Sequence, residues 1–337
     1  MSPERFAEIS ASYSRLRLGV VGDFCLDRYL EIDPARAETS IETGLPVHNV
    51  VRVRSQPGAA GTIVNNLVAL GVGRIDLVGF CGEDGEGFEL LRVLRALSGV
   101  GLDYFEQTPT RATFTYTKPL VMEPDGPPRE LSRLDIKNWT PTPAALSARL
   151  AAHVQELAAE VDGLIIMDQV SLAETGVVTS PVLAAVAEVA AQRPELPILA
   201  DSRRSLRQYP AVTLKMNAHE LAALTGASVT DPGVAATQLA RARGSRVIVT
   251  LAERGLLGAL PDDEAAVLIS AWPVRGEIDV VGAGDAVTAN ITAALAGGAT
   301  FAEALACGNA AASIVIHQLG TTGTASRDQL ARLLAAT

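Results

Sequence analysis

The chain has few of the residues that build metal centres or disulfide scaffolds. Its 337 residues include three cysteines, none of them in a C-x-x-C pair, and four histidines without the spacing of metal ligands. The cysteines are Cys25, Cys81 and Cys307, and the histidines are His48, His153, His219 and His317. This composition supports neither a zinc site nor a disulfide framework.

Long apolar runs and clusters of basic residues are also missing. No segment approaches the roughly 20 apolar residues that span a bilayer, and Met1–Phe6 lacks the apolar core of a signal peptide. The formal net charge is −10 and no run of Lys or Arg stands out, which argues against a surface that follows nucleic-acid phosphates. We therefore expect a soluble cytoplasmic protein that binds neither membranes nor nucleic acids.

Several nucleotide-binding and hydrolytic motifs are absent as well. The sequence has no G-x-x-x-x-G-K-[ST], no correctly placed G-x-G-x-x-G, no G-x-S-x-G and no H-E-x-x-H. A dinucleotide-dependent oxidoreductase is disfavoured because no glycine fingerprint follows the first predicted strand. A seat for a phosphate must therefore differ from a P-loop.

What the chain does contain is a glycine-rich turn before a predicted helix. Gly282, Ala283 and Gly284 carry little side-chain bulk, and an apolar helical pattern begins at Ala286. The first amides of a helix have no internal acceptors and lie at the positive end of its dipole, so this turn predicts a seat for a phosphoryl group. Asp285 then either accepts the proton of an attacking hydroxyl or is a first-turn acid favoured by the dipole.

Helices and strands alternate regularly after Asn138, which predicts a mostly parallel sheet with right-handed crossovers. The expected strands are Gly163–Met167, Ile198–Ala200, Thr213–Met216 and Val247–Leu251, and the expected helices are Pro143–Ala159, Pro181–Ala191, Ala218–Leu224 and Val234–Ala242. The length of the chain suffices for one large α/β domain with a small appendage.

Polar residues follow these strands at the sheet edge where ligands bind in open α/β folds. They are Asp168, Asp201, Asn217 and Thr250. An earlier apolar strand, Leu18–Gly22, leads to Asp23 and Asp27, which either hold substrate hydroxyls or cap turns. One edge of the sheet is thus expected to collect the site.

Two segments interrupt this pattern with short alternating strands. They cover residues 29–53 and 110–135, and their clearest strands are Val47–Val53, Thr113–Thr117 and Glu130–Asp135. We expect one small β-sheet, a lid, laid over a core made of residues 1–28, 54–109 and 136–337. A lid with an exposed apolar face would favour a homodimer.

Asn217 and Glu220 have the spacing of a capping box, which is a purely structural motif. Alternatively, Glu220 faces the phosphate edge and organises a hydrated Mg²⁺, which commonly uses one or two carboxylates together with substrate phosphates. The small residues of Gly308–Ser313 likewise fit close helix packing or a space for a flat base.

Taken together, these motifs resemble the ribokinase-like (PfkB) family of carbohydrate kinases across nearly the whole chain. Asp279–Asp285 is similar to the family signature D-T-x-G-A-G-D, and Pro57–Gly71 is similar to its glycine-rich turn ending in N-L-A-x-L-G. Asn217–Glu220 resembles N-x-x-E, and Val249–Leu251 resembles V-T-L-G. The implied fold is a three-layer α/β/α domain with a mostly parallel central sheet and a small β-sheet lid.

Within this family the chain looks most like the bacterial heptose-phosphate kinase type. Gly22–Tyr29 resembles its opening G-D-x-x-L-D-R-Y, Arg133–Asp135 its R-L-D in the lid, and Gln318–Ser326 its ending around K-L-G-T. Such proteins often carry a fused nucleotidyltransferase with an H-x-G-H motif, which this sequence lacks. We therefore expect the kinase half only.

The resemblance implies transfer of the γ-phosphoryl group of ATP to a hydroxyl of a sugar or sugar phosphate. Asp285 would be the general base, and the amides of Gly282, Ala283, Gly284 and Asp285 would stabilise the transferring group. The implied substrate-binding residues are Asp27, Asp23, Gly58, Ala59, Thr62 and Asn66. The implied nucleotide-binding residues are Asn217, Thr250, Gly255 and Asn309. Glu220 and Asn217 would hold Mg²⁺ through water, and Asp279 matches the side chain beside a monovalent cation such as K⁺.

Some positions depart from the family pattern. Ala59 and Thr62 replace a glycine and an asparagine of the sugar-binding turn, Val280 replaces the signature threonine, and Ala252 replaces the glycine after Thr250. Threonine has one short hydroxyl where an asparagine amide both donates and accepts, so the sugar contacts must differ. The alternative hypothesis is a catalytically altered domain that senses a sugar or nucleotide without turnover.

Overall fold

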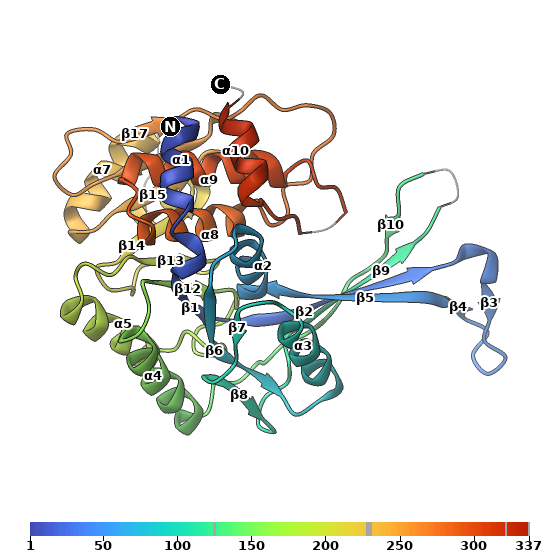
Figure 1. Cartoon of the computed structure of the whole chain (residues 1–337). Helices are drawn as coiled ribbons and strands as arrows, with labels where there is room; N and C mark the ends of the chain where they lie inside the picture. The colour runs from blue at the N-terminus through green and yellow to red at the C-terminus, as the bar shows by residue number, and fades with distance from the viewer. Residues whose placement is uncertain (124–125, 227–230, 321, 336–337) are drawn as a thin grey trace.

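The computed structural model describes the whole chain except residues 124–125, 227–230, 321 and 336–337. A large twisted sheet lies between two layers of helices, and a smaller sheet projects from one end (Figure 1). This architecture confirms the predicted three-layer α/β/α fold with a mostly parallel central sheet.

The large sheet has ten strands, in the order β17-β16-β15-β14-β13-β12-β1-β6-β7, with β8 also paired to β6. All pairs from β15 to β7 are parallel, whereas β16 and β17 add an antiparallel edge. The strands are β1 (Arg17–Gly22), β6 (Arg74–Gly82), β7 (Val100–Gly101), β8 (Phe105–Thr108), β12 (Gly163–Asp168), β13 (Ile198–Ser202), β14 (Thr213–Asn217), β15 (Val247–Thr250), β16 (Leu256–Ala259) and β17 (Val267–Ile269).

Helices cover both faces of this sheet. On one face lie α1 (Pro3–Ser10), α2 (Ala60–Leu70), α3 (Gly85–Arg95), α8 (Ala283–Ala296), α9 (Phe301–Val315) and α10 (Arg327–Ala335). On the other lie α4 (Ala144–Ala158), α5 (Ser180–Gln192), α6 (Ala218–Thr225) and α7 (Pro232–Arg243). Short 3-10 helices occur at Tyr13–Arg15, Pro34–Arg36 and Ala252–Arg254.

Strand β12 shows why the central strands read as continuous apolar runs. Leu164 and Ile166 pack into the core beneath α4 and α5, while Ile165 and Met167 pack into the core beneath α8 and α9. Side chains alternate between the faces of a strand, so a strand covered on both sides is apolar at every position. The four strands and four helices predicted after Asn138 are confirmed, with ends that differ by at most two residues.

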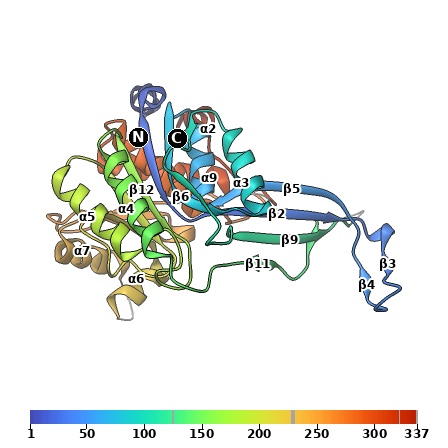
Figure 2. The same ribbon diagram turned by 90° about the horizontal axis from the view of Figure 1, so that it is seen from below.

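The smaller sheet, which we call the lid, consists of β2 (Phe24–Ile32), β5 (Val50–Ala59), β9 (Thr115–Val121), β10 (Arg129–Glu130) and β11 (Leu134–Ile136). Strand β2 pairs antiparallel with β5 and parallel with β9. Seen from below in Figure 2, the lid extends away from the helical layers, and a hairpin of β3 (Glu38–Thr39) and β4 (Pro46–Val47) lies at its far end.

Two of the predicted lid strands are each divided in the structure, so those predictions were wrong in detail. β4 ends at Val47 and β5 begins at Val50, because the chain leaves the hairpin there to join the lid. β10 and β11 pair with different parts of β9, on either side of Pro119, which has no N–H to offer a continuous ladder.

The lid sheet also reaches beyond the predicted boundaries, since β2 begins at Phe24 and β5 ends at Ala59. It therefore joins the core directly, through Gly22 on one side and helix α2 on the other. The division of the chain into a core and a lid unit stays a prediction, and residues 124–125 of that unit lie outside the described residues.

Candidate active site

The site forms where the lid meets the carboxyl ends of the parallel strands. There, β13 and β14 end close to the first turn of α8, and β2 of the lid carries Asp27. Asp285 comes from α8, Asp201 from β13 and Lys215 from β14, and these charges act on one another electrostatically. The structure thus brings together residues that are more than 250 positions apart in the sequence.

The turn before α8 has the backbone of an anion seat. Gly282 is the N-cap residue, with a φ of 83° that a residue with a side chain would adopt only under strain, and no side chain caps the helix. The N–H of Ala283 donates to the carbonyl of Val280 at 3.2 Å. The N–H groups of Gly282, Gly284 and Asp285 have no acceptor in the described part of the chain. Three of the four predicted amides therefore remain available to a ligand.

Asp279 fixes this turn from outside. Its carboxylate accepts hydrogen bonds from the N–H of Val281 at 3.0 Å and from that of Gly320 at 3.4 Å. Its own N–H donates to the carbonyl of Ile316. Asp279 therefore joins the turn to the segment after α9. Thr321 of the expected ending motif lies outside the described residues.

Asp285 has the electrostatics of a base that titrates near neutral pH. Burial raises the pKa of its carboxyl group to about 7, Lys215 opposes that rise, and Asp201 and Asp27 add to it. The repulsion from Asp27 shows that the lid carboxylate and the helix carboxylate face the same region. A carboxylate with a pKa near 7 suits general-base catalysis.

Lys215 was not among the residues predicted for the site. It is buried on β14, and its Nζ lies 2.6 Å from Oδ2 of Asp201. A Cβ on Gly284 would lie 3.0 Å from that Nζ, so the ammonium group sits directly beside the anion turn. The available sequence signal was a lysine in the middle of a short strand, between Leu214 and Met216.

Asp27 is buried on β2, and its carboxylate accepts no hydrogen bond from the described part of the chain. Burial raises the pKa of its carboxyl group, and the nearby Lys118 and Arg133 oppose that rise. A Cβ on Gly58 would lie 2.6 Å from Oδ2 of Asp27, so only glycine leaves room for this carboxylate. Asp27 therefore keeps both oxygens available for a ligand.

Basic and aromatic side chains surround Asp27 on the same face of the lid. Lys118 lies 5.2 Å from the ring centre of Tyr29, and the guanidinium of Arg133 lies 5.0 Å from that of Tyr116. Burial raises the pKa of Tyr116, and Arg203 of the loop after β13 opposes that rise. Arg133 of this basic face, defined by Lys118, Arg133 and Arg203, already pairs with Asp135 at 2.7 Å. Lys118 and Arg203 remain as cations suited to an anionic group.

Asp23 lies next to the site but points into the protein. Its carboxylate accepts hydrogen bonds from the N–H groups of Val177 at 2.7 Å, Gln169 at 2.8 Å and Val170 at 3.2 Å. Burial and the charge of Asp168 raise its pKa to about 7. These contacts make Asp23 an anchor for the loop after β12 rather than a free ligand for substrate.

Thr62 and Asn66, two residues of the turn that is expected to bind the sugar, are buried. Asn66 donates to the carbonyls of Thr62 at 3.0 Å and Gly323 at 3.4 Å, and it accepts from the N–H of Ala325 at 3.2 Å. It therefore joins α2 to the chain after α9. Thr62 is fully buried, and Ala59 has a φ of 53°, a backbone conformation that glycine adopts more readily.

Asn217 and Glu220 form the capping box of α6. The N–H of Glu220 donates to Asn217 at 2.9 Å, and the N–H of Asn217 donates to Oε2 of Glu220 at 2.8 Å. Oε1 of Glu220 has no partner in the described residues. The described ranges hold no group of three or more His, Cys, Asp or Glu side chains that could ligate a metal. The unpartnered Oε1 of Glu220 fits a hydrated Mg²⁺, an ion that commonly uses one or two carboxylates together with phosphates and water.

The other predicted nucleotide-binding residues lie along the antiparallel edge of the sheet. Thr250 ends β15, and Gly255 has a φ of 100°. A Cβ on Gly255 would lie 2.1 Å from the carbonyl oxygen of Ile269, so its glycine is needed for close backbone packing. Asn309 is buried on α9 and donates to the carbonyl of Ser270 at 2.8 Å.

Comparison with solved structures gives the class of the fold, which is ribokinase-like. A ribokinase from Arabidopsis thaliana complexed with ribose and ATP superposes with a TM-score of 0.69 at 21% identity, covering 95% of this chain and 98% of that one. The phosphofructokinase-2 from Escherichia coli in complex with fructose-6-phosphate has the same TM-score at 19% identity, covering 95% and 99%. At these identities the likeness establishes the fold.

Sequence comparison gives the family: the chain belongs to the pfkB family of carbohydrate kinases, whose profile matches residues 24–328. The bifunctional protein HldE of Rhodospirillum rubrum is 32% identical over 335 residues, or 96% of this chain. HldE of Gluconacetobacter diazotrophicus is 32% identical over 331 residues, or 95% of this chain. The chain spans 64% of the length of both relatives. Every helix in the described ranges is too short or too polar to cross a membrane.

Proposed function

We propose that this protein transfers the γ-phosphoryl group of ATP to a hydroxyl of a sugar phosphate. The observation that carries the proposal is Asp285, a base with a pKa of about 7, at the start of a helix with unpartnered amides and opposite the uncommitted carboxylate of Asp27. The pfkB family membership supports the sugar kinase class.

In this mechanism Asp27 accepts a hydrogen bond from the acceptor and orients its reactive hydroxyl. That hydroxyl gives its proton to Asp285 as its oxygen forms a bond to the γ-phosphorus, and the bond from phosphorus to the leaving ADP oxygen breaks. The amides of Gly282, Gly284 and Asp285 donate to the phosphoryl oxygens in transit. The burial of Asp27 keeps water from its carboxylate and strengthens its interaction with the acceptor.

The nucleotide would lie along the edge that carries Asn217, Thr250, Gly255 and Asn309. Glu220 and Asn217 would hold Mg²⁺ through water, and the ion would neutralise charge on the phosphate oxygens. Asp279 would lie beside a monovalent cation such as K⁺, since it already orders the turn and the segment after α9.

The acceptor is inferred from the basic face of the lid. Lys118 and Arg133 face the same region as Asp27, and Arg203 approaches it from the core. Arg133 already pairs with Asp135 at 2.7 Å, whereas Lys118 and Arg203 form no ion pair with the described residues. A sugar phosphate would give these two cations a partner that a neutral sugar lacks. The resemblance of the sequence to the bacterial heptose-phosphate kinase type supports such a substrate.

We further propose that the protein forms a homodimer through the lid and acts in the cytoplasm, where ATP is abundant. On the lid face opposite Asp27, Val53, Leu134 and Ile136 are 52%, 63% and 39% exposed. The alternation of side chains places all three on one face, across β2 and β9 from each other. Burying this face against a second copy would remove it from water.

A second candidate is a sensor that binds a sugar or nucleotide without turnover. One observation favours it: the N–H of Ala283 donates to the carbonyl of Val280, so the turn offers one amide fewer to a phosphoryl group. The strained backbone of Ala59, where the family has glycine, points the same way.

One assay separates the two functions. The protein is incubated with ATP, Mg²⁺ and a panel of sugars and sugar phosphates, and ADP release is measured. A kinase releases ADP with an anionic acceptor, and Asp285→Asn slows ADP release by roughly 10²–10⁴-fold. The control Asp262→Asn, at an exposed carboxylate remote from the site, leaves ADP release unchanged. Binding without ADP release would support the sensor, and an Asp285→Asn variant as active as the wild type would refute the mechanism.

A further inference from the structure

Lys215 is a buried cation that the mechanism above does not use. It is 6% exposed on β14, and its Nζ lies 2.6 Å from Oδ2 of Asp201, which also accepts from the hydroxyl of Thr288 at 3.4 Å. Burial lowers the pKa of Lys215, but Asp201, Asp285 and Glu220 raise it above its ordinary value overall. The side chain is therefore an ammonium ion at neutral pH.

The ammonium group has donors to spare. It carries three N–H bonds, and the hydrogen bonds within the described part of the chain account for one, to Asp201. Nζ also lies beside the anion turn, because a Cβ on Gly284 would come within 3.0 Å of it. Glycine at position 284 thus leaves an open path between the ammonium and the unpartnered amides of the turn.

A purely structural role would not require this arrangement. An ion pair in a protein interior is costly to desolvate, and well-packed neutral side chains often replace it without loss of stability. Here the ion pair lies beside Asp285 at the edge of the sheet that carries the site, and the ammonium group lowers the pKa of Asp285. A cation at this position matters most when negative charge arrives.

We propose that Lys215 is a further catalytic residue, whose ammonium contacts the phosphoryl group in transit opposite the amides of the anion turn. The proposal rests on the phosphotransfer function proposed above. Lys215 donates one or two hydrogen bonds to the equatorial phosphoryl oxygens and keeps its protons throughout, while Asp201 holds the ammonium in place. Asp201 is accordingly a positioning residue.

The test uses three variants: Lys215→Met, Asp201→Asn, and the two substitutions combined. Lys215→Met leaves Asp201 as an unpaired buried charge, whereas the double variant removes both charges and keeps the packing volume. If the lysine only neutralises Asp201, the double variant regains the wild-type kcat. If it contacts the phosphoryl group, the double variant stays roughly 10²–10³-fold slower, as expected for the loss of one preorganised donor. The kcat values are compared at pH 9, where Asp285 is ionised, so that shifts of its pKa do not enter.

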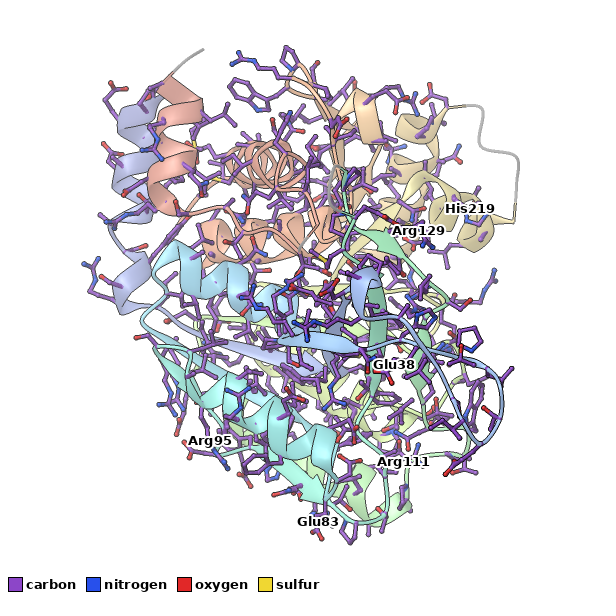
Figure 3. All side chains as sticks on the ribbon, turned by 90° about the vertical axis from the view of Figure 1, so that its right-hand side faces the viewer. Glu38, Glu83, Arg95, Arg111, Arg129 and His219 are labelled. Atoms are coloured by element: carbon purple, nitrogen blue, oxygen red, sulfur yellow. The ribbon has the colours of Figure 1, made fainter. Side chains whose placement is uncertain are left out.

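Binding measurements provide a second readout that needs no acceptor. Wild-type protein with Mg²⁺ is expected to bind ADP more tightly when aluminium fluoride, a planar anion shaped like the phosphoryl group, is added. Lys215→Met and the double variant should lose at least tenfold of this enhancement while binding ADP alone as the wild type does. Arg95→Met is the matched control for loss of a cation. Arg95 lies on α3, far from His219 of α6, the helix that follows the strand of Lys215 (Figure 3).

These outcomes separate the two proposals. A wild type that turns over no acceptor, yet loses the aluminium fluoride enhancement when Lys215 is replaced, refutes the kinase function and supports the phosphoryl contact. A double variant with wild-type kcat, or with an unchanged enhancement, overturns the role of Lys215 whatever the activity of the wild type.

Discussion

The pH dependence of catalysis tests the central carboxylate directly. The pKa of Asp285 is raised to about 7 from an ordinary 3.8 by burial and by its acidic neighbours. Only the ionised form can accept the proton of the acceptor, so activity is present above this pKa and is lost as the pH falls through it. Below pH 6 we expect kcat/KM to fall by about tenfold for each further pH unit.

The same shift predicts a stability change with a definite sign. A carboxyl group whose pKa is raised in the folded protein stabilises the fold below its unfolded pKa of 3.8, and that contribution is lost as the pH rises through about 7. A shift of about 3 units corresponds to about 4 kcal/mol at most, and partial contact with solvent reduces it. Asp285→Asn, which mimics the neutral acid, should therefore be more stable than the wild type at pH 8 by on the order of 1–4 kcal/mol.

Both effects are measured on the same pair of proteins. Initial rates with saturating ATP give kcat/KM for the acceptor between pH 5 and 9 in steps, and urea unfolding gives the free energy of unfolding at pH 4 and pH 8. The stability gain of Asp285→Asn should shrink toward zero at the lower pH. A wild-type acid limb near pH 4, or an Asn variant less stable than the wild type at pH 8, would show that the fold does not raise the pKa of Asp285.

Three other substitutions test the surroundings of the base. Gly58→Ala would place a Cβ 2.6 Å from Oδ2 of Asp27, so displacement of that carboxylate should lower kcat/KM for the acceptor by roughly 10²-fold with the KM for ATP unchanged. Asn66→Ala should lower the free energy of unfolding by about 1–3 kcal/mol, because the N–H of Ala325 loses its acceptor; an unchanged urea midpoint would contradict that bridge. Ala59→Gly should leave the free energy of unfolding unchanged or raise it by up to about 1 kcal/mol, since relief of strain at φ 53° offsets the added chain entropy. The control Ala69→Gly, inside α2, should lower the free energy of unfolding by about 1 kcal/mol. If both substitutions had the same effect, the argument from strain at Ala59 would be wrong.

The fold could be predicted to a large extent because its signals are local. The strands buried on both faces read as apolar runs, and the helices between them carry clear ends. The lid was harder to place, since its strands are short and pair with partners far along the chain. The split around Pro119 follows from a missing N–H in a neighbouring strand, which no inspection of residues 130–135 alone can reveal.

The site was predictable where backbone shape carries the function. Gly282 and Gly284 predict a turn with unpartnered amides, and the spacing of Asn217 and Glu220 predicts their capping box. Side-chain direction was not predictable. Asp23 and Asp27 stand four residues apart and look alike in sequence, yet one anchors a loop while the other keeps its carboxylate open.

The sequence by itself determined that a helix beginning with a glycine turn carries Asp285, because that information lies in adjacent residues. Only the tertiary structure decided the chemistry of this carboxylate. Its pKa depends on Lys215, Asp201 and Asp27, which come from two core strands and the lid. Electrostatic interactions depend on distance in space and on burial, and the folding of the chain sets both.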